Sequence, residues 1–308
     1  MEKEILIFGH KNPDTDSICS AMVKERLNKK NGHDSSVAVR LGNINKETQY
    51  VLNYLNLEAP ELKEEVAEGQ KVIMVDHNEF NQSIKGIEKA KILGVVDHHR
   101  IANFETSDPL YYTARPYGCT STILFQDFKG KGIEINREEA ILMASAIISD
   151  TLLLKSPTTT KHDEKALEEL EKIAGIDIKE YGLEMLKAGT DLDDFTAKEL
   201  INLDAKELDK NGIKFVIGQV NTVDIPSVLE RQEELEKAIE EESKEKELAL
   251  FVLAITDILN SNSEILVLGE KSSVVEKAFD KKLENNRAFL EGVVSRKKQL
   301  LPNIDKNI

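Results

Sequence analysis

The segment of residues 9–17 (GHKNPDTDS) combines one imidazole and two carboxylates directly after an apolar stretch. His10, Asp14 and Asp16 are the side chains of this segment that could ligate a metal ion. In the alternative interpretation, Pro13 sets a turn and one of the two aspartates caps the helix that follows. A cap accounts for only one carboxylate, so the segment indicates a metal or phosphate site at the end of a strand.

Two further clusters of acid and imidazole follow apolar strands later in the chain. Asp76 is followed by His77, and Asp97 is followed by His98 and His99. Alone, the first pair is more typical of a cap or a turn, whereas two adjacent imidazoles after an apolar strand favour metal ligation. Because the ends of parallel strands meet at one edge of a sheet, these side chains are expected to converge with those of the first segment.

Asp150 follows the apolar run of residues 140–148 and is a further candidate ligand. By itself it is more typical of a helix end or a turn. Together, the aspartates and histidines form a ligand set without thiolates, which suits Mn²⁺, Co²⁺ or Mg²⁺. They exceed what one ion needs, so we expect two divalent ions and a bridging hydroxide that attacks a phosphoryl group.

A basic segment, residues 295–299 (SRKKQ), follows a predicted strand near the end of the chain. Three adjacent cations are usually solvated surface charge, and alone they carry little functional weight. In an acidic chain whose other half gathers carboxylates, Arg296 and Lys297 could bind the phosphate oxygens that the metals also hold. We expect both side chains to be exposed before substrate binds.

Length and composition indicate a soluble globular protein of 308 residues, which is long enough for two domains. The formal net charge of -15 argues against sequence-independent binding to nucleic acid. No apolar run approaches the ~20 residues that span a bilayer, and the first residues lack a signal-peptide pattern. We therefore expect a cytoplasmic protein without membrane contact. Cys19 and Cys119 lack a metal-binding spacing and are expected to be small buried residues.

The first part of the chain alternates strand and helix patterns, which predicts an α/β domain with a mainly parallel sheet covered by helices on both faces. The predicted strands are residues 4–8, 36–40, 71–75 and 92–96. The predicted helices are residues 17–28, 46–55, 120–128, 137–148 and 161–174.

The polar, glycine-containing stretch of residues 187–194 predicts a domain boundary. We expect a metal-binding catalytic domain over residues 1–188, a hinge over 189–194 and a smaller α/β domain with a mixed sheet over 195–308. Strands are predicted at residues 213–220, 248–256, 264–268 and 289–294, with a charged helix over 227–247. The active site is expected in the cleft between the two domains.

In this combination and order, the motifs resemble those of the family II inorganic pyrophosphatases, the manganese-dependent branch of the DHH phosphoesterase superfamily. The resemblance rests on the segment 9–17, on Asp76-His77-Asn78, on Asp97-His98-His99, on Ser149-Asp150-Thr151 and on the basic segment, and it spans the whole chain. It implies hydrolysis of pyrophosphate to two orthophosphates, a preference for Mn²⁺ or Co²⁺, Mg²⁺ with the substrate, and a homodimer formed through the N-terminal domain.

The resemblance also implies a role for each site residue. One metal would be held by His10, Asp14 and Asp76, and the second by Asp16, Asp76, His98 and Asp150. The substrate would be bound by His99, Lys206, Arg296 and Lys297, which with Asp14 form the catalytic set. Asp97 and His77 would orient the ligands. Only a short stretch, residues 58–70, stands where some members carry a nucleotide-sensing insertion, so regulation by that route is not expected.

Two other functions fit parts of the sequence. Another DHH phosphoesterase, such as an oligonucleotide phosphatase or an exopolyphosphatase, would share the N-terminal cluster. The late glycine-rich loop with histidine that is typical of the nucleic-acid-degrading relatives is replaced here by the basic segment, and an aromatic content of 5% leaves little for stacking bases. A non-catalytic metal-binding or nucleotide-binding module would require His99, Arg296 and Lys297 to be incidental.

Overall fold

The first sheet carries the strand ends that position the candidate ligands. The computed structural model describes residues 4–308, and its internal contacts divide it into two compact units with the boundary between Gly189 and Thr190. In the first unit, β1 (Ile5–Phe8), β2 (Ser36–Arg40), β3 (Glu61–Leu62), β4 (Lys71–Val75), β5 (Lys91–Asp97) and β6 (Tyr111–Ala114) form a sheet in the order β3-β2-β1-β4-β5-β6. Every pairing in it is parallel, which confirms the predicted α/β class.

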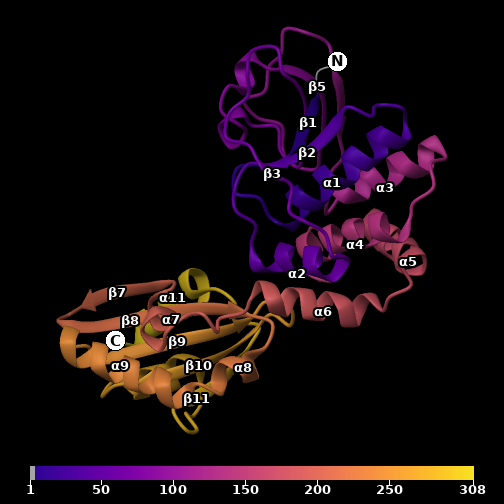
Figure 1. Cartoon of the computed structure of the whole chain (residues 1–308). Helices are drawn as coiled ribbons and strands as arrows, with labels where there is room; N and C mark the ends of the chain where they lie inside the picture. Colours follow the sequence, from indigo (N-terminus) through magenta and orange to yellow (C-terminus); the bar gives the residue numbers. More distant parts are fainter. Residues whose placement is uncertain (1–3) are drawn as a thin grey trace. The chain divides into compact units, whose positions relative to one another are not determined.

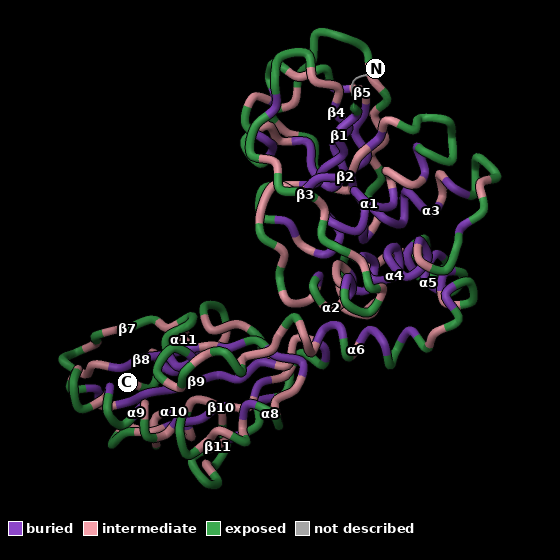
Figure 2. The backbone as a smooth tube through the Cα atoms, viewed as in Figure 1, coloured by how far each residue is buried: buried purple, intermediate pink, exposed green. Residues whose placement is uncertain are grey.

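Helices of the first unit cover one face of this sheet and hold two of the candidate ligands (Figure 1). They are α1 (Thr15–Lys30), α2 (Lys46–Leu55), α3 (Thr120–Lys131), α4 (Arg137–Thr151), α5 (Lys161–Ala174) and α6 (Ile178–Gly189). Helix α1 packs on β1 and β2, α3 packs on β5, and α4 lies against α1. The strands buried beneath them read as continuous apolar runs, as expected for a parallel sheet (Figure 2).

The opposite face of the first sheet is covered by loops and short 3₁₀-helices, whereas the sequence predicted α-helices on both faces. There Phe8, Val72 and Met74 pack against a loop region that contains two short 3₁₀-helices, Phe80–Gln82 and Ile87–Lys89. The connections from β4 to β5 and from β5 to β6 carry no α-helix. Ile84, Ile87 and Phe104 supply the apolar side chains that helices would otherwise provide.

The second unit is built on a mixed five-stranded sheet in the order β11-β10-β9-β8-β7. Its strands are β7 (Ala205–Lys210), β8 (Ile213–Thr222), β9 (Leu250–Asp257), β10 (Asn262–Leu268) and β11 (Arg287–Glu291). Only β8 and β9 pair in parallel. Helices α7 (Ala197–Asn202), α8 (Ile225–Leu229) and α9 (Gln232–Lys246) cover one face, and α10 (Ser272–Phe279) and α11 (Leu301–Asn307) cover the other.

Several elements escaped the sequence analysis or have other bounds. Strands β3, β6 and β7, which are short or polar edge strands, were not predicted from the sequence. Helices α6, α7, α10 and α11 were not predicted either. The helix predicted over residues 227–247 is two helices, because the chain turns at Glu230 and Arg231. Helix α6 continues to Gly189 and so includes the start of the stretch predicted as a linker. None of the helices in residues 4–308 combines the length and apolarity needed to cross a membrane.

Candidate metal centre and phosphate-binding segment

Five of the candidate ligands lie where a strand of the first sheet ends or in the first turn of the helix that follows it, and Asp150 lies in the last turn of α4. The chain turns into α1 just beyond β1, and Asp14 caps that helix by accepting a hydrogen bond from the Ser17 N–H at 2.9 Å. Asp76 directly follows β4 with a left-handed backbone (φ 58°), and its N–H donates to Val96 O of β5. His98 directly follows β5. The alternative interpretation of Asp14 as a cap is therefore correct, but it does not prevent Asp14 from facing the cluster.

Three overlapping groups of side chains bring their ligand atoms together, and all three share Asp76. They are His10 with Asp14 and Asp76; Asp16 with Asp76, His98 and Asp150; and Asp76 with His98 and His99. Within each group the ligand atoms lie within 4.8 Å of one another. The structure therefore brings together the six residues predicted as metal ligands.

The distances place Asp76 between the side chains of His10 and Asp14 on one side and those of His98 and Asp150 on the other. Its Oδ2 lies 3.4 Å from His10 Nε2, and its Oδ1 lies 3.4 Å from His98 Nε2. Asp14 Oδ2 is 3.5 Å from His10 Nε2, and Asp150 Oδ2 is 3.6 Å from His98 Nε2. Two carboxylate oxygens of one buried residue thus face two different imidazoles, which is the geometry of a bridging ligand.

The electrostatics of the cluster are those of buried carboxylates without enough compensating charge. Burial and the charge of Asp76 raise the pKa of Asp16 to about 6, and burial with the charges of Asp16 and Asp76 raises the pKa of Asp150 well above its ordinary value. Burial alone would raise the pKa of Asp76, but its contacts with His10 and His98 hold that pKa far below the ordinary value.

The donor set fits divalent cations. Asp150 Oδ2 is buried without a hydrogen-bond partner among the described residues, and a buried carboxylate oxygen requires a donor or a cation. Burial would lower the pKa of His10 and of His98, yet their carboxylate neighbours raise it to about 10 and about 9. Positive charge is thus favoured at this position. Oxygen and imidazole donors without thiolate are typical of Mn²⁺ and related ions.

Neighbouring groups fix the orientation of the ligands. Ser17 Oγ donates to Asp76 Oδ2 at 2.7 Å, and Thr120 Oγ1 lies 3.3 Å from Asp76 Oδ1. His98 Nδ1 lies 3.0 Å from Tyr117 O, which leaves Nε2 to face the carboxylates. Such partners hold a ligand in its binding geometry. Sequence reasoning missed these hydroxyl residues, because Ser and Thr at helix starts are ordinary capping residues.

His99 lies at the exposed side of the cluster. Its side chain is 52% exposed, and its Nδ1 lies 3.0 Å from Asp97 Oδ1 and 3.7 Å from Asp76 Oδ1. Asp97 is buried and also accepts from Asn78 Nδ2. Contact with Asp97 raises the pKa of His99, although burial opposes the shift. This imidazole can therefore carry a proton toward an anionic ligand.

His77 lies next to the cluster without joining any of the three groups. Its Nδ1 lies 2.9 Å from Val75 O, and its ring packs edge-on against the ring of His10. Burial lowers the pKa of His77 to about 4, so this imidazole stays neutral. Cys19 and Cys119 are both buried, as expected, and neither belongs to a ligand group.

In the second unit, the basic segment begins a single π-helical turn, Arg296–Leu300. A hollow of about 410 Å³ is lined by Arg296, Lys297, Asp204 and Gln219 among others. Lys297 is exposed, as expected. Arg296 is not: its side chain is 19% exposed, because its guanidinium pairs with Asp204 Oδ1 at 2.8 Å and donates to Asp204 O at 2.8 Å.

Lys206 lies on the same face of the second sheet as Arg296. Lys206 pairs with Ile217 across β7 and β8, and Arg296 Nη1 donates to Ile217 O at 3.4 Å. Leu208, two residues along the same face of β7, packs on the core cluster that contains Leu300 and Ile304. The structure thus gathers Lys206, Arg296 and Lys297 in one region, although nothing in the local sequence had indicated Lys206.

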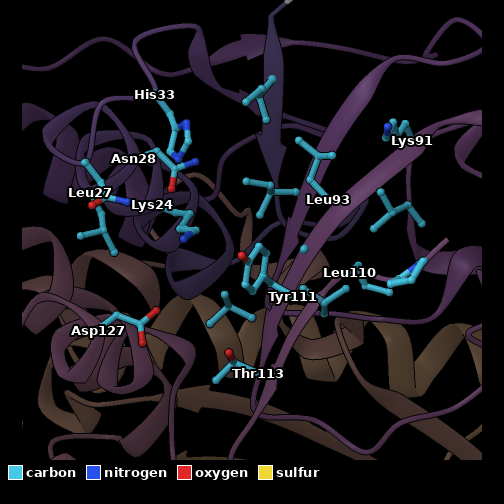
Figure 3. Close-up of a pocket in the computed structure, with 18 of the residues that line it drawn as sticks. Lys24, Leu27, Asn28, His33, Lys91, Leu93, Leu110, Tyr111, Thr113 and Asp127 are labelled. Carbon is cyan, nitrogen blue, oxygen red and sulfur yellow. The ribbon is translucent and has the colours of Figure 1, made fainter. Parts of the chain in front are cut away.

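A larger hollow of about 770 Å³ lies elsewhere in the first unit (Figure 3). None of the candidate ligands is among the described residues that line it. Lys24, Leu27 and Asn28 of α1 lie opposite Leu93 and Tyr111 of the strands (Figure 3). This hollow is therefore separate from the metal centre.

Comparison with known proteins agrees with the geometry. A family model described as "DHH family, N-terminal domain" matches residues 4–147, and one described as "DHHA2 domain" matches residues 183–307. The manganese-dependent inorganic pyrophosphatase of Bacillus subtilis is 57% identical over 303 residues, which cover 98% of this chain and 97% of that protein. The chain belongs to the family II inorganic pyrophosphatases.

Other members agree with this assignment over the full length. A "Probable manganese-dependent inorganic pyrophosphatase" of Staphylococcus carnosus is 57% identical over 298 residues, covering 97% of both chains. The crystal structure of a "putative family II inorganic pyrophosphatase" of Methanococcus jannaschii has 41% sequence identity and a TM-score of 0.61, covering 98% of this chain and 99% of that one. The family predicted from the motifs is confirmed.

Proposed function

We propose that this protein hydrolyses inorganic pyrophosphate to two orthophosphates at a pair of Mn²⁺ ions. The observation that carries the proposal is the convergence of His10, Asp14, Asp16, His98 and Asp150 around Asp76. The names of the full-length relatives agree with it. When bound, two divalent ions would lower the pKa of a shared water to near neutrality and neutralise phosphoryl oxygens.

The residues of the first unit divide between holding the ions and contacting the substrate. His10 and Asp14 would bind one ion, Asp16, His98 and Asp150 the other, and Asp76 both. His99, held through Nδ1 by Asp97, would direct its other ring nitrogen to the pyrophosphate near the bridging oxygen. There it can stabilise negative charge as the bond to the leaving phosphate breaks.

The cations of the second unit would bind the remaining phosphate oxygens. Arg296 is already oriented by Asp204, so its planar fork loses little freedom when it binds phosphate. Lys206 and Lys297 would add point charges. Because the two sets of residues belong to different units, we propose that the units close around the substrate, with residues 189–194 as the hinge, and exclude bulk water.

A comparison of three substrates tests this function. Phosphate release with Mn²⁺ should be rapid from pyrophosphate and at least about a hundredfold slower from a dinucleotide and from a long polyphosphate. Faster release from polyphosphate or the dinucleotide would instead support another DHH phosphoesterase. No release from any of the three would favour a binding module. Activity that survives metal removal by a chelator would contradict the metal mechanism.

We also propose that the protein is a homodimer formed through its first unit. Strand β6 ends the sheet, and Tyr111 on it is 88% exposed. An exposed edge strand is suited to pairing with another chain, and a twofold axis would let two copies use the same edge. Sedimentation should show a dimer that Tyr111→Arg dissociates and that Tyr54→Arg, at an exposed position of α2, leaves intact. The cytoplasmic location stays a prediction for cell fractionation.

A further inference from the structure

Asp163 of α5 is a buried carboxylate whose hydrogen bonds run to two different places. On its own helix, Asp163 Oδ2 accepts from the N–H and the hydroxyl of Thr160 at 2.8 and 2.7 Å, which caps α5. Toward the start of α3, Oδ2 accepts from Gly118 N at 2.9 Å and Oδ1 accepts from Thr122 Oγ1 at 2.6 Å. Its exposed fraction is 0%. The second set of bonds is unnecessary for capping a helix.

Gly118 and Thr122 belong to residues 117–122, here called the α3 entry segment, and this segment contacts candidate metal ligands. The N–H groups of Thr120 and Ser121 donate to the two oxygens of Asp16 at 2.8 and 3.3 Å. They are the first N–H groups of α3, whose dipole also favours a carboxylate at this end. The entry segment therefore fixes both oxygens of Asp16.

The same segment fixes two further ligands. Tyr117 O lies 3.0 Å from His98 Nδ1, and Thr120 Oγ1 lies 3.3 Å from Asp76 Oδ1. Thus three of the four residues in the group of Asp16, Asp76, His98 and Asp150 are oriented by the α3 entry segment. In the group of His10, Asp14 and Asp76, only the shared Asp76 has such a bond.

Packing leaves the entry segment little freedom while Asp163 is in place. A Cβ atom at Gly118 would lie 2.9 Å from Asp163 Oδ2 and 2.8 Å from Thr151 Cγ2, both inside van der Waals contact. The backbone therefore lies directly against the carboxylate and the end of α4. Removing the carboxylate would leave the buried Gly118 N–H without its partner, and the segment would have to move to satisfy it.

We propose that Asp163 is a positioning residue for one of the two metal sites, that of Asp16, Asp76, His98 and Asp150. It anchors the α3 entry segment, and the segment orients the ligands. The inference rests on the proposed function, since it requires the two ions. It goes beyond that function because it assigns Asp163, which touches neither metal nor substrate, an effect on one of the two metal sites and not on the other.

Titration of metal-free protein with Mn²⁺ by calorimetry, without pyrophosphate, tests this role. In Asp163→Ala we expect the affinity of one ion to fall by at least about tenfold, in the range usual for partners of metal ligands, while the affinity of the other ion changes far less. Asp163→Asn should restore most of the loss. The asparagine oxygen can accept from Gly118 N, and its amide can donate to Thr122 Oγ1.

Thr160→Ala is the matched control, because it removes the Thr160 hydroxyl from the capping box of α5 and leaves the bonds of Asp163 to the entry segment in place. It should lower the melting temperature and leave both Mn²⁺ affinities unchanged. Thr122→Val removes only the bond from the entry segment to Asp163 Oδ1 and should weaken the same ion as Asp163→Ala. This variant decides the question if Asp163→Ala does not fold.

Two results would overturn the inference while leaving the metal site intact. One is Asp163→Ala with a lower melting temperature but both affinities within about twofold of wild type. The other is an equal loss of affinity for both ions in Thr122→Val. A wild-type protein that binds no pair of Mn²⁺ ions would instead overturn the proposed function, and this role with it, so the two failures are distinguishable.

Discussion

At the scale of single residues, the site separates side chains that can hold metal from side chains that can contact substrate. The candidate ligands were predictable because acid and imidazole cluster after apolar strands, which is a strong local pattern. Lys206 could be named only through family resemblance, since a lysine on a polar edge strand carries no local signal. Asp163 could not be found at all, because its partners Thr122 and Gly118 lie 41 and 45 residues away.

The first prediction concerns His99. In His99→Gln we expect the bound Mn²⁺ to stay at the wild-type level and turnover to fall about a hundredfold, because a glutamine cannot supply a proton or positive charge. Metal analysis and phosphate release measure the two quantities. Because His99 also lies within reach of Asp76, a loss of Mn²⁺ in this variant would show that it is a metal ligand instead.

The second prediction compares two adjacent cations. Lys297→Ala and Arg296→Ala should each raise KM for pyrophosphate, since each removes a charge from the hollow that we propose binds phosphate. Only Arg296→Ala should also cost stability, about 0.5–1.5 kcal/mol, through its lost hydrogen bonds to Asp204 and Ile217. Denaturant unfolding of both variants checks this difference. Equal losses of stability in the two variants would show that the contacts of the Arg296 guanidinium with Asp204 and Ile217 do not stabilise the fold.

At the scale of elements, the site depends on how closely the end of β1 meets the start of α1. Most strand and helix positions followed from apolar periodicity. The bounds of β2 and β4 match the prediction, and those of β1, β5, β8, β9 and β10 differ from it by one or two residues. The edge strands β3, β6 and β7 were missed because β3 and β6 have only two and four residues and β7 is mostly polar. The loops that cover the opposite face of the first sheet were not predicted, because irregular segments show no apolar periodicity.

The third prediction tests the meeting of β1 and α1. A Cβ at Gly9 would lie 2.5 Å from Ser17 Cβ and 2.8 Å from Ser17 Cα, so Gly9→Ala must push the start of α1 away. We expect a loss of about 1–3 kcal/mol in the free energy of unfolding, as for other overpacked sites, together with weaker Mn²⁺ binding. Gly130→Ala in α3, where nothing lies within 4 Å, should be neutral or stabilising by up to about 1 kcal/mol.

At the scale of the whole molecule, metal binding couples to protonation. In the metal-free protein the pKa of His10 is about 10 and that of His98 about 9, both above the ordinary value of 6.5. Both imidazoles are therefore protonated at pH 7, and each must lose its proton before it can ligate a metal.

The fourth prediction follows from the raised pKa values of His10 and His98. Mn²⁺ binding at pH 7 should release at least about two protons, one from each imidazole, and the affinity should rise with pH until it levels off near pH 10. Calorimetry in buffers of different ionisation enthalpy measures the proton release. No proton release at pH 7 would mean that the two imidazoles are neutral before the metal binds.

The central claim is that Asp76 is shared by two divalent ions. Equilibrium dialysis of wild type and Asp76→Asn against Mn²⁺, with metal counted per chain, tests it most directly. We predict two bound Mn²⁺ in wild type and weakened binding of both in Asp76→Asn, with circular dichroism unchanged. A single ion in wild type, or an Asp76→Asn variant that loses only one of two ions, would contradict the account.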